Sequence, residues 1–478
     1  MAVYRQFGIA CCLPKHYLCT RKTDNKTKTL HNMNMKKQQL MWAFLMPSLL
    51  SPAAADGQVT VGDSVMTHAQ GRRLTVGGYG EVAYSRNFHS DNQYRYRYPE
   101  KYRNDPSNGR FDIPHSVIYL GYDFGKGWTF GTEIEFEHTG TGSSIEIEND
   151  EGGEYEHEVE KGGEVELEQM WIQKSFSKAA NLRFGHIIVP VGLNNAHHEP
   201  LNFFTVYRPE GENTILPSTW HDTGVSFWGR SGDFRYELLM VAGLDAMLFS
   251  RDGWVNGGAG SAFEFKPANK YGYALRIDNY SLDGLRIGLS GYYGQSMHNT
   301  YPNDMEGEGK TYGKTKANVL IGSIDFTLDK LNWIVRGQAD YGYISDTPML
   351  NSAKINSQKN SPYNKTYVGK NAIAVGVEAG YDIMSAVRAP WVQGRKLYVF
   401  ARYDYYDSYI RERSQPEATN GYTKRSVVAA GINYHPVPQV AIKAHYSHRF
   451  LSSPCNDEPS LNIGVVYEGF FLGGRSKD

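Results

Sequence analysis

The residues with the greatest capacity for chemistry form an acidic segment, 133–168, in which fourteen Asp and Glu accompany a single Lys. Hard divalent cations bind several carboxylate oxygens, so one hypothesis for this segment is a cation site. A second is a solvated hairpin, because every second residue from Glu154 to Glu160 is Glu, which places these side chains on one face of an extended chain. A third is ion-mediated bridging to lipopolysaccharide. No EF-hand spacing is present, and the three alternatives stay open.

A second group of candidates consists of His197, His198 and Glu199, followed along the chain by His221 and Asp222. Adjacent histidines on an extended chain point to opposite faces, which disfavours capture of one metal ion by both rings. These five side chains are also the ones that could serve a barrel hydrolase, which needs a base beside its nucleophile. The chain after residue 55 contains no G-x-S-x-G, H-E-x-x-H or C-x-x-C motif. We therefore predict that the protein is not an enzyme and has no catalytic residue, metal or cofactor.

The elements that position these residues are predicted to be β-strands, because the sequence from residue 74 onward alternates with a period of two. In residues 331–343 every second residue is apolar or glycine, and the residues between them include Arg336, Gln338 and Asp340. Most such runs are close to the roughly 9–11 residues that a tilted membrane strand needs. Sixteen strands are predicted, at 74–84, 116–124, 128–138, 165–176, 181–189, 222–229, 233–243, 270–279, 284–294, 317–328, 331–344, 371–383, 395–407, 424–434, 438–449 and 460–471.

The connections between these strands alternate in length, and this decides the fold class. Tight turns such as 125–127, 230–232 and 329–330 alternate with long loops such as 190–221 and 345–370. In lipid every backbone polar group must be paired, so a membrane-spanning sheet has to close. We predict an all-β fold, a 16-stranded antiparallel transmembrane β-barrel with long extracellular loops and short periplasmic turns. Aromatic residues near strand ends indicate interfacial girdles; they are Tyr119, Trp128, Trp228, Tyr341, Tyr343, Tyr403 and Tyr446.

The first 55 residues are expected to lie outside the barrel. Lys36 and Lys37, the apolar run that follows them and the small residues ending at Ala55 are typical of a signal peptide. The expected division of the chain is an extension or misassigned start at 1–32, the signal peptide at 33–55, a periplasmic N-terminal segment at 56–73, the barrel at 74–471 and a C-terminal tail at 472–478.

The charge balance changes once this leader is set aside. The whole chain holds 50 Lys and Arg against 51 Asp and Glu, whereas the part after residue 55 holds 42 against 50, a net charge of −8. An acidic chain of this kind argues against nucleic-acid binding. After residue 55 no apolar run approaches the roughly 18 residues of a transmembrane helix, so strands are left as the means of spanning a membrane.

Two stretches of the sequence resemble a known family. LRFGHIIVPVGLNNAHHEPLNFFTVYRPE at 182–210 and FGTEIEFEHTGTGSSIEIEN at 130–149 are similar to the porin O/P family, the phosphate-selective porins. The resemblance implies a porin of the Gram-negative outer membrane, commonly a homotrimer, that passes ions and small hydrophilic solutes. It also implies contact with membrane lipid, lipopolysaccharide and the barrel-assembly machinery. That machinery usually reads a terminal aromatic residue, but here residues 472–478 follow Phe471, which would have to be read internally.

The third long loop of such porins folds into the barrel and narrows it, which implies the same for residues 190–221. Prolines and aromatic side chains in this loop suit a stiff segment with apolar anchors. A surface loop packed on its neighbours is the alternative. The residues expected at the constriction are Pro190, Gly192, His197, His198, Glu199, Arg208, Glu210 and Glu212.

Charged residues on the predicted inward faces are expected to line the pore. The basic ones are Arg183, Arg235, Arg276, Arg286, Arg336, Arg402 and Lys443, and the acidic ones are Glu133, Glu135, Glu237, Asp278, Asp340, Glu378 and Asp404. Seven residues of each sign give no clear field, so phosphate selectivity is not expected. We predict a weakly selective diffusion channel in which neutralising Arg336 and Asp340 as a charged pair alters conductance. A binding or adhesin barrel with little conductance, a barrel hydrolase and a soluble secreted β-protein are the alternatives.

Overall fold

The computed structural model describes residues 73–92, 94–138, 143–149, 155–161, 164–261, 265–299, 312–357, 365–416 and 421–472. The extension at 1–32 and the signal peptide at 33–55, both predicted from the sequence, lie outside the described residues. Of the segment 56–73 only Arg73 is described, and of the tail 472–478 only Leu472.

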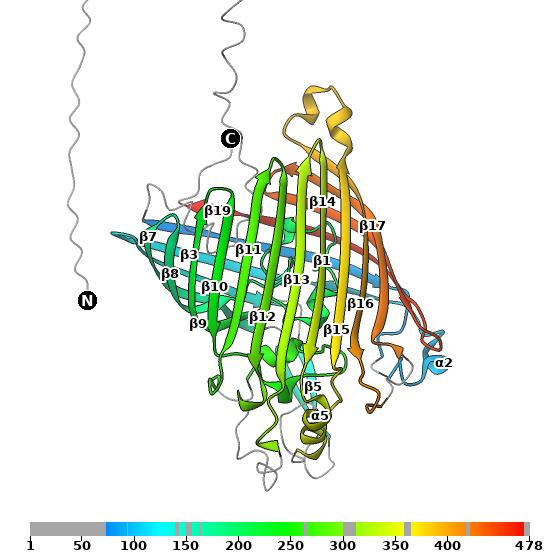
Figure 1. The fold of residues 1–478 in the computed structure, drawn as a ribbon. Coiled ribbons are helices and arrows are strands. Elements are labelled where there is room, and N and C mark those ends of the chain that lie inside the picture. The colour runs from blue at the N-terminus through cyan, green and yellow to red at the C-terminus, as the bar shows by residue number, and fades with distance from the viewer. Residues whose placement is uncertain are drawn as a thin grey trace, which may run out of the picture. The chain divides into compact units, whose positions relative to one another are not determined.

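Sixteen long antiparallel strands close into a barrel within the described part of the chain (Figure 1). The first strand pairs with the last on one side and with β3 on the other, so the sheet closes on itself. The predicted fold class is confirmed. The strands are β1 (Leu74–Asn87), β3 (His115–Gly125), β4 (Trp128–Glu137), β7 (Glu164–Ser177), β8 (Ala180–Ile188), β9 (His221–Ser231), β10 (Phe234–Val241), β11 (Gly272–Leu282), β12 (Leu285–Gln295), β13 (Asn318–Lys330), β14 (Trp333–Ile344), β15 (Asn371–Asp382), β16 (Lys396–Ile410), β17 (Lys424–Val437), β18 (Val440–Leu451) and β19 (Glu458–Leu472).

A short strand, β2 (Asn108–Asp112), joins the same sheet without adding a position to the barrel wall. It pairs with the end of β1, Ala83–Asn87, whereas β3 pairs with Leu74–Gly80 of the same strand. The sequence predicted one long loop over this stretch, which is wrong here because β1 extends further and offers β2 a partner.

Short turns and long loops lie at opposite ends of the barrel (Figure 1). In the turns, Lys126 and Asn332 adopt positive φ angles of 55° and 67°, as tight hairpin connections require. One larger turn holds η6 (Ile383–Ala386) and η7 (Pro390–Val392). The long loops hold α2 (Pro99–Tyr102), the hairpin of β5 (Ser143–Asn149) and β6 (Tyr155–Lys161), η1 (Pro200–Asn202), α3 (Glu212–Ile215), η2 (Ala246–Leu248), η3 (Asn256–Ala259), η4 (Met297–Asn299) and α5 (Thr347–Asn356).

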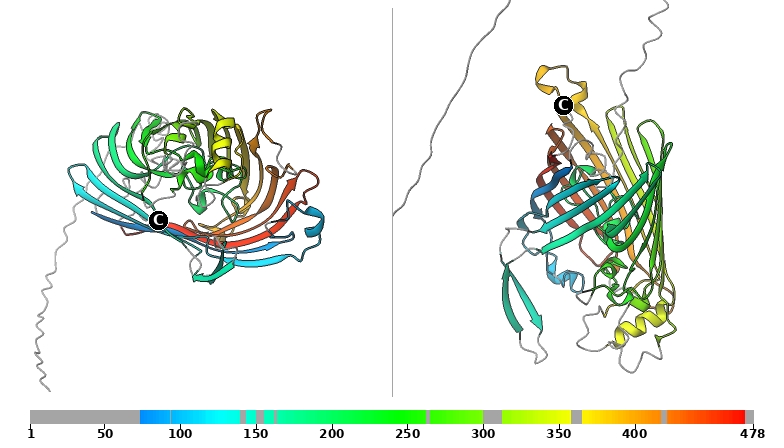
Figure 2. Two further views of the ribbon diagram at one scale, coloured as in Figure 1. Left: turned by 90° about the horizontal axis from the view of Figure 1, so that it is seen from below. Right: turned by 90° about the vertical axis from the view of Figure 1, so that its left-hand side faces the viewer.

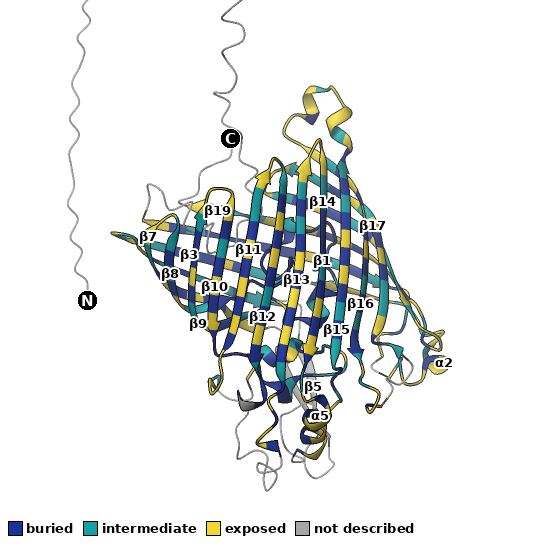
Figure 3. Ribbon diagram, viewed as in Figure 1, coloured by how far each residue is buried: buried dark blue, intermediate teal, exposed yellow. Residues whose placement is uncertain are grey.

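Side chains along each strand alternate between an exposed outer face and a buried inner face (Figure 3). On β13, Leu320 and Ile324 are 55% and 54% exposed, whereas Ser323 and Asp325 between and beside them are buried. The polarity of this barrel is therefore inverted relative to a water-soluble fold, with apolar residues outside and charged residues inside.

The aromatic residues expected at the membrane interfaces divide between the two faces. Five of them point outward and are exposed: Trp128, Tyr341, Tyr343, Tyr403 and Tyr446. Tyr119 and Trp228 point inward and are buried, so they cannot belong to an outer girdle. In the described residues no helix is long and apolar enough to cross a bilayer.

Candidate functional site

The connection between β8 and β9, residues 189–220, lies inside the barrel and is called the inner loop. Figure 2, which looks along the barrel in its left panel, shows the interior partly occupied by loop segments. Almost every residue from Val189 to Glu199 is buried, and the side chains around them come from strands on several sides of the barrel. A loop in this position needs partners for its backbone polar groups, and the inward-facing charged residues supply them.

The first anchor of the inner loop is Gly192. Its N–H donates to Ser290 Oγ of β12 at 3.1 Å, and its carbonyl accepts from Arg276 Nη1 of β11 at 2.7 Å. The residue has a φ of 88°, and a Cβ built there would lie 2.2 Å from Glu212 Oε1. Only glycine fits this turn, because the positive φ angle and the lack of space for a Cβ atom both exclude other residues.

Glu212 organises the start of the loop from within. Its carboxylate accepts the backbone N–H groups of Leu193, Asn194 and Asn195 at 2.8–2.9 Å. Burial raises the pKa of the Glu212 carboxyl to about 7, even though these three donors favour its charged form. The turn is therefore held by one side chain that is itself completely buried.

The second anchor is Lys443, which reaches the loop from β18 on another part of the wall. Its ammonium group donates to the carbonyls of Pro200, Phe203 and Thr205 at 2.5, 2.8 and 2.9 Å. Phe204, within the same stretch, stacks on Phe400 of β16 with ring centroids 5.2 Å apart. An ammonium has three donors, so this arrangement uses the full capacity of the Lys443 side chain.

The third anchor joins the end of the loop to both sides of the barrel. Arg208 Nη2 lies 3.2 Å from Tyr79 OH of β1 and 3.6 Å from Glu135 Oε1 of β4. Glu210 accepts from Tyr406 OH at 2.7 Å and pairs with Arg449 of β18. Burial raises the pKa of Glu210, but the Arg449 guanidinium outweighs it and holds this pKa below its usual value.

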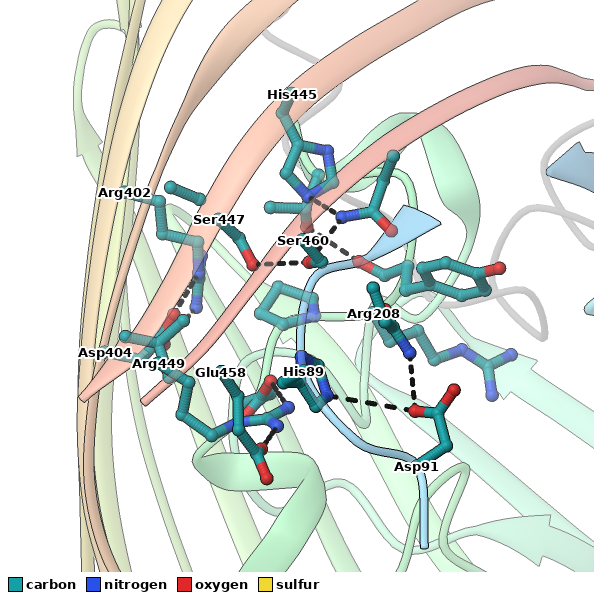
Figure 4. A pocket seen from close by; sticks show the side chains of 18 of the residues that line it. His89, Asp91, Arg208, Arg402, Asp404, His445, Ser447, Arg449, Glu458 and Ser460 are labelled. Atoms are coloured by element: carbon teal, nitrogen blue, oxygen red, sulfur yellow. Dashed lines mark hydrogen bonds and ion pairs between the residues drawn. The ribbon is translucent and has the colours of Figure 1, made fainter. Parts of the chain in front are cut away.

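A cavity of about 330 Å³ lies beside the inner loop, against the wall formed by β16 to β19 and β1. Figure 4 shows Arg402, Asp404 and Arg449 on one side of this cavity and Arg208 and Asp91 on the other. The lining mixes both signs of charge with serine and histidine side chains. The ionisable residues that line it are His89, Asp91, Arg95, Arg110, Arg208, Glu210, Arg402, Asp404, His445, Arg449 and Glu458.

Ten of the inward charges of β10 to β16 form ion pairs with one another, and we call the surface that they make the paired wall. Its ten members are Arg235, Glu237, Arg276, Asp278, Arg286, Asp325, Arg336, Glu378, Arg402 and Asp404, all buried. Arg276 Nη2 lies 2.9 Å from Asp278 and 3.0 Å from Asp325, and Arg286 contacts the same two carboxylates.

Cross-strand register explains the second half of the paired wall. Arg336, Glu378 and Arg402 lie directly opposite one another on β14, β15 and β16, and Glu378 bonds both guanidinium groups at 2.6 and 3.1 Å. Arg336 was expected to pair with Asp340, but its partner is Glu378. Asp340 forms no ion pair among the described residues, and Ser323, directly opposite on β13, is its hydrogen-bonding neighbour.

A second surface of the interior carries carboxylates almost alone, and we call it the acidic wall. It consists of Glu81 on β1, Glu133 and Glu135 on β4, and Glu168 on β7, each at most 3% exposed. His115 contacts Glu81 at 2.8 Å, and Arg208 contacts Glu135. Glu168 forms no ion pair with Lys or Arg among the described residues, and its carboxyl hydrogen-bonds with those of Glu133 and Glu135.

Sequence reasoning missed Glu81, Glu168 and Asp325 as inward charges. Glu168 is the informative case, because strict alternation with Gln169 and Trp171 would turn it outward. A β-bulge at this point of β7 places both Glu168 and Gln169 on the inner face, since Glu133 pairs with Gln169 and Ile134 with Leu167. The break in apolar spacing between Leu167 and Met170 is the only sign of it in the sequence of β7, and the pairing of β4 with β7 shows which residue is the extra one.

The remaining predicted residues occupy separate places. Arg183 stacks over the Trp171 ring of the inner wall with 4.6 Å to the centroid, and Pro190 is buried at the start of the inner loop. His197 is buried. Its pKa lies well below the usual value, mainly because of burial and secondly because of the positive charge of the nearby Arg286. Glu199 accepts from Asn202 at 2.7 Å.

The cluster considered for a hydrolase does not assemble. His221 Nδ1 lies 2.5 Å from His186 Nε2, and Asp222 pairs with Lys266 at 3.1 Å. In the described part of the chain, no hydrogen bond or ion pair joins either of them to residues 197–199.

The chain is similar in sequence to another protein and in fold to several solved structures. No family model matches the chain. An uncharacterized protein of Aquifex aeolicus (strain VF5) is 27% identical over 422 residues, which cover 86% of this chain and 82% of that protein.

Similar solved structures are outer-membrane proteins. The anion-selective porin from Comamonas acidovorans shares 8% identity over 83% of this chain and 99% of that chain, with a TM-score of 0.46. Pseudomonas putida OprB shares 11% identity over 86% of this chain and 97% of that chain, with a TM-score of 0.46. Salmonella typhi OmpF in complex with daunomycin shares 10% identity over 83% of this chain and 97% of that chain, with a TM-score of 0.48. At such low similarity the function has to be argued from the geometry of this chain.

Proposed function

We propose that this chain is a porin-type channel of the Gram-negative outer membrane that passes ions and small hydrophilic solutes by passive diffusion. The inversion of polarity carries the proposal. Outward residues such as Leu320, Ile324 and Val399 are apolar and about half exposed, and only lipid would cover such a band around a whole barrel. The inward charges, by contrast, suit a hydrated interior.

We further propose that solutes pass through the cavity between the inner loop and the wall of β16 to β19. Three observations support this path. The loop is tied to the wall by Lys443, Arg276 and Glu210, so it is a fixed obstruction. The cavity that remains beside it is polar, and hydroxyl and charged groups line it on both sides. A small hydrophilic solute could exchange its water for these groups.

The charges of this cavity favour weak selectivity. Its five arginines stand close to the four carboxylates of Asp91, Glu210, Asp404 and Glu458. A channel whose lining alternates in sign repels neither cations nor anions strongly. We therefore propose a general diffusion channel rather than one that selects phosphate.

Planar bilayer recording tests this proposal directly. Purified protein that shows a heat-dependent gel shift, and is therefore folded, is added to a bilayer separating two KCl concentrations. We expect discrete conductance steps and a reversal potential near zero. Folded protein that gives no steps at any concentration would overturn the channel proposal, and a strong anion preference would overturn weak selectivity.

The obstruction by the inner loop has its own test. Lys443→Met removes three hydrogen bonds to the loop, so we expect a larger and noisier single-channel conductance. Lys424→Met is the matched control, because this exposed residue at the start of β17 does not contact the loop's carbonyls. Equal conductance of both variants and the wild type would argue against the loop as the narrowest point.

A binding barrel with little conductance is the second candidate, and one observation favours it. The loops at the long-loop end pack an apolar cluster that includes Trp220, Trp254 and Phe249, all at most 1% exposed. Such a cluster blocks part of the mouth without leaving room for water. The bilayer experiment separates the two candidates, since a plugged barrel would insert without conducting.

A further inference from the structure

A compact set of metal-ligand atoms lies where the inner loop meets the acidic wall. His198 Nε2 of the loop is 3.5 Å from Glu133 Oε1 of β4 and 3.8 Å from Glu168 Oε2 of β7. One ligand atom from each of the three residues lies within 4.8 Å of the others. We propose that these residues bind one divalent transition metal ion, of which Zn²⁺ is the representative, and that the ion fastens the inner loop to the barrel wall.

The distances suit such an ion. Ligand atoms about 2.0–2.1 Å from a tetrahedral metal lie roughly 3.4 Å from one another, so the observed separations need little adjustment. One imidazole and two carboxylates form a nitrogen and oxygen set that first-row transition metals accept. Three protein ligands leave a fourth position for water or for a solute group.

The ring of His198 is oriented for metal binding by its other nitrogen. His198 Nδ1 lies 3.3 Å from the carbonyl oxygen of Asn195, to which it donates its proton. Nε2 then faces the two carboxylates. Metal-binding histidines are commonly held in this way by a backbone carbonyl.

The carboxylates are prepared in the same manner. Gln169 Nε2 donates to Glu133 Oε2 at 2.5 Å, which leaves Glu133 Oε1 for the ion. No backbone, amide or hydroxyl donor of the described residues bonds His198 Nε2 or either oxygen of Glu168; the Glu168 carboxyl lies against those of Glu133 and Glu135, its only hydrogen-bonding neighbours in that part of the chain. All three side chains are at most 2% exposed, and polar atoms so deeply buried normally have partners.

The β-bulge in β7 is independent support for the site. Without the extra residue, β7 would present Gln169 but not Glu168 to the interior. Bulges of this kind redirect a side chain and are common beside functional sites. Here the redirected side chain is the second carboxylate of the proposed set.

The charge of a divalent ion matches that of the two carboxylates of the set. The ionised carboxylates of Glu133 and Glu168 carry a charge of −2, which one divalent ion neutralises. The nearest strong cation, Arg208, is engaged by Glu135 and Tyr79 instead. Isolated buried carboxylates are costly, so a partner of charge +2 fits the space that these residues enclose.

Titration of the folded full chain in detergent tests the proposal. The protein is stripped with EDTA, dialysed and titrated with ZnCl₂ in a calorimeter. We expect one ion per chain, and at least 10-fold weaker binding in both His198→Gln and Glu168→Gln. Heat-dependent gel mobility establishes whether each variant is folded. If His198→Gln does not fold, Glu168→Gln alone tests the proposal.

Two matched controls sharpen the result. His197→Gln changes the neighbouring histidine, which belongs to no group of possible ligands, and Asp283→Asn changes an exposed carboxylate at the turn end. Both variants should bind Zn²⁺ as the wild type does. The proposal is overturned if the wild type shows no saturable binding, if both site variants bind normally, or if the controls lose binding equally.

A spectroscopic readout distinguishes this site from loose surface binding. Co²⁺ substituted for Zn²⁺ should give the intense visible absorption of a four-coordinate site in the wild type and in His197→Gln. The spectrum should be absent in His198→Gln. A weak octahedral spectrum in the wild type would contradict a four-coordinate site and overturn the proposed geometry.

Discussion

The paired wall and the acidic wall belong to one barrel and solve the problem of buried charge in opposite ways. On the paired wall five arginines meet five carboxylates, and the register of adjacent strands places Arg336, Glu378 and Arg402 side by side. On the acidic wall four carboxylates face the inner loop with no arginine on their own strands within ion-pair distance among the described residues. The ten charges of the paired wall balance one another, and only Asp340 beside them on β14 lacks an ion pair among the described residues, whereas the acidic wall depends on cations that come from elsewhere.

This difference indicates where each wall contributes. A surface that neutralises itself can serve as scaffold, because its charges are satisfied whatever the loop does. A surface that lacks cations responds to anything positive that approaches, including Arg208, His198 or a metal ion. Buried carboxylates without a cation are costly for folding, which is why we propose the acidic wall as the part that binds a cation.

The largest expected effect comes from removing a guanidinium from the paired wall. Arg276→Met leaves Asp278 and Asp325 with less compensation and the Gly192 carbonyl without its donor, so we expect a loss of about 3–5 kcal/mol in the free energy of unfolding. Urea unfolding in detergent micelles measures it. Arg110→Met, which alters an exposed arginine of the cavity, is the control, and an equal loss in both would erase the distinction between the walls.

The same chemical change should have opposite signs on the two walls. Glu378→Gln deprives Arg336 and Arg402 of their shared carboxylate, and we expect it to cost about 3 kcal/mol. Glu168→Gln in metal-free protein removes an uncompensated carboxylate, and we expect it to stabilise by about 1 kcal/mol. Urea unfolding of both variants after EDTA treatment decides the point. Destabilisation of similar size in the two would show that Glu168 is not short of a partner.

Arg208 of the inner loop should reduce the negative potential that the acidic wall exerts on passing ions. Arg208→Gln removes the cation that contacts Glu135, so we expect the reversal potential in a KCl gradient to move toward cation preference. A unit charge about 4 Å away in water is worth about 1 kcal/mol, or roughly a 5-fold change in local ion concentration. Arg97→Gln, an exposed change in α2's loop, should leave the potential unchanged. A shift toward anions would contradict the expected sign.

The smallest effect is expected at the turn end, where ion pairs are exposed. Lys330 Nζ lies 3.4 Å from Asp283, and the two side chains are 49% and 87% exposed. Lys330→Ala should change the free energy of unfolding by less than about 0.5 kcal/mol, because water screens such pairs. A loss comparable to that of Arg276→Met would mean that burial does not explain the strength of the paired wall.

Strand number and facing could be predicted from sequence, because each long strand carries its own alternation. The short strand β2 could not, since five residues inside a loop acquire strand geometry only by pairing with the extended end of β1. The barrel's closure follows from physics once the strands are known, because open edges are excluded in lipid.

The site was less accessible for the same reason, since it depends on relations between strands. Sequence placed Arg336 and Asp340 on one face but could not show that Glu378 lies opposite Arg336. His198 and Glu133 were both singled out, yet nothing in their spacing indicates that they face each other. Such contacts depend on how the inner loop crosses the barrel, which is set by distant residues such as Lys443 and Arg276.

The bulge in β7 reverses which residues of this strand face outward. Before the bulge the odd-numbered residues Val165 and Leu167 face outward, and after it the even-numbered residues Met170 and Ile172 do. Deleting Glu168 would restore an unbroken alternation of apolar and polar positions. A single inserted codon thus separates an ordinary barrel strand from one that offers a third ligand, and a barrel can gain or lose such a site without altering any other strand.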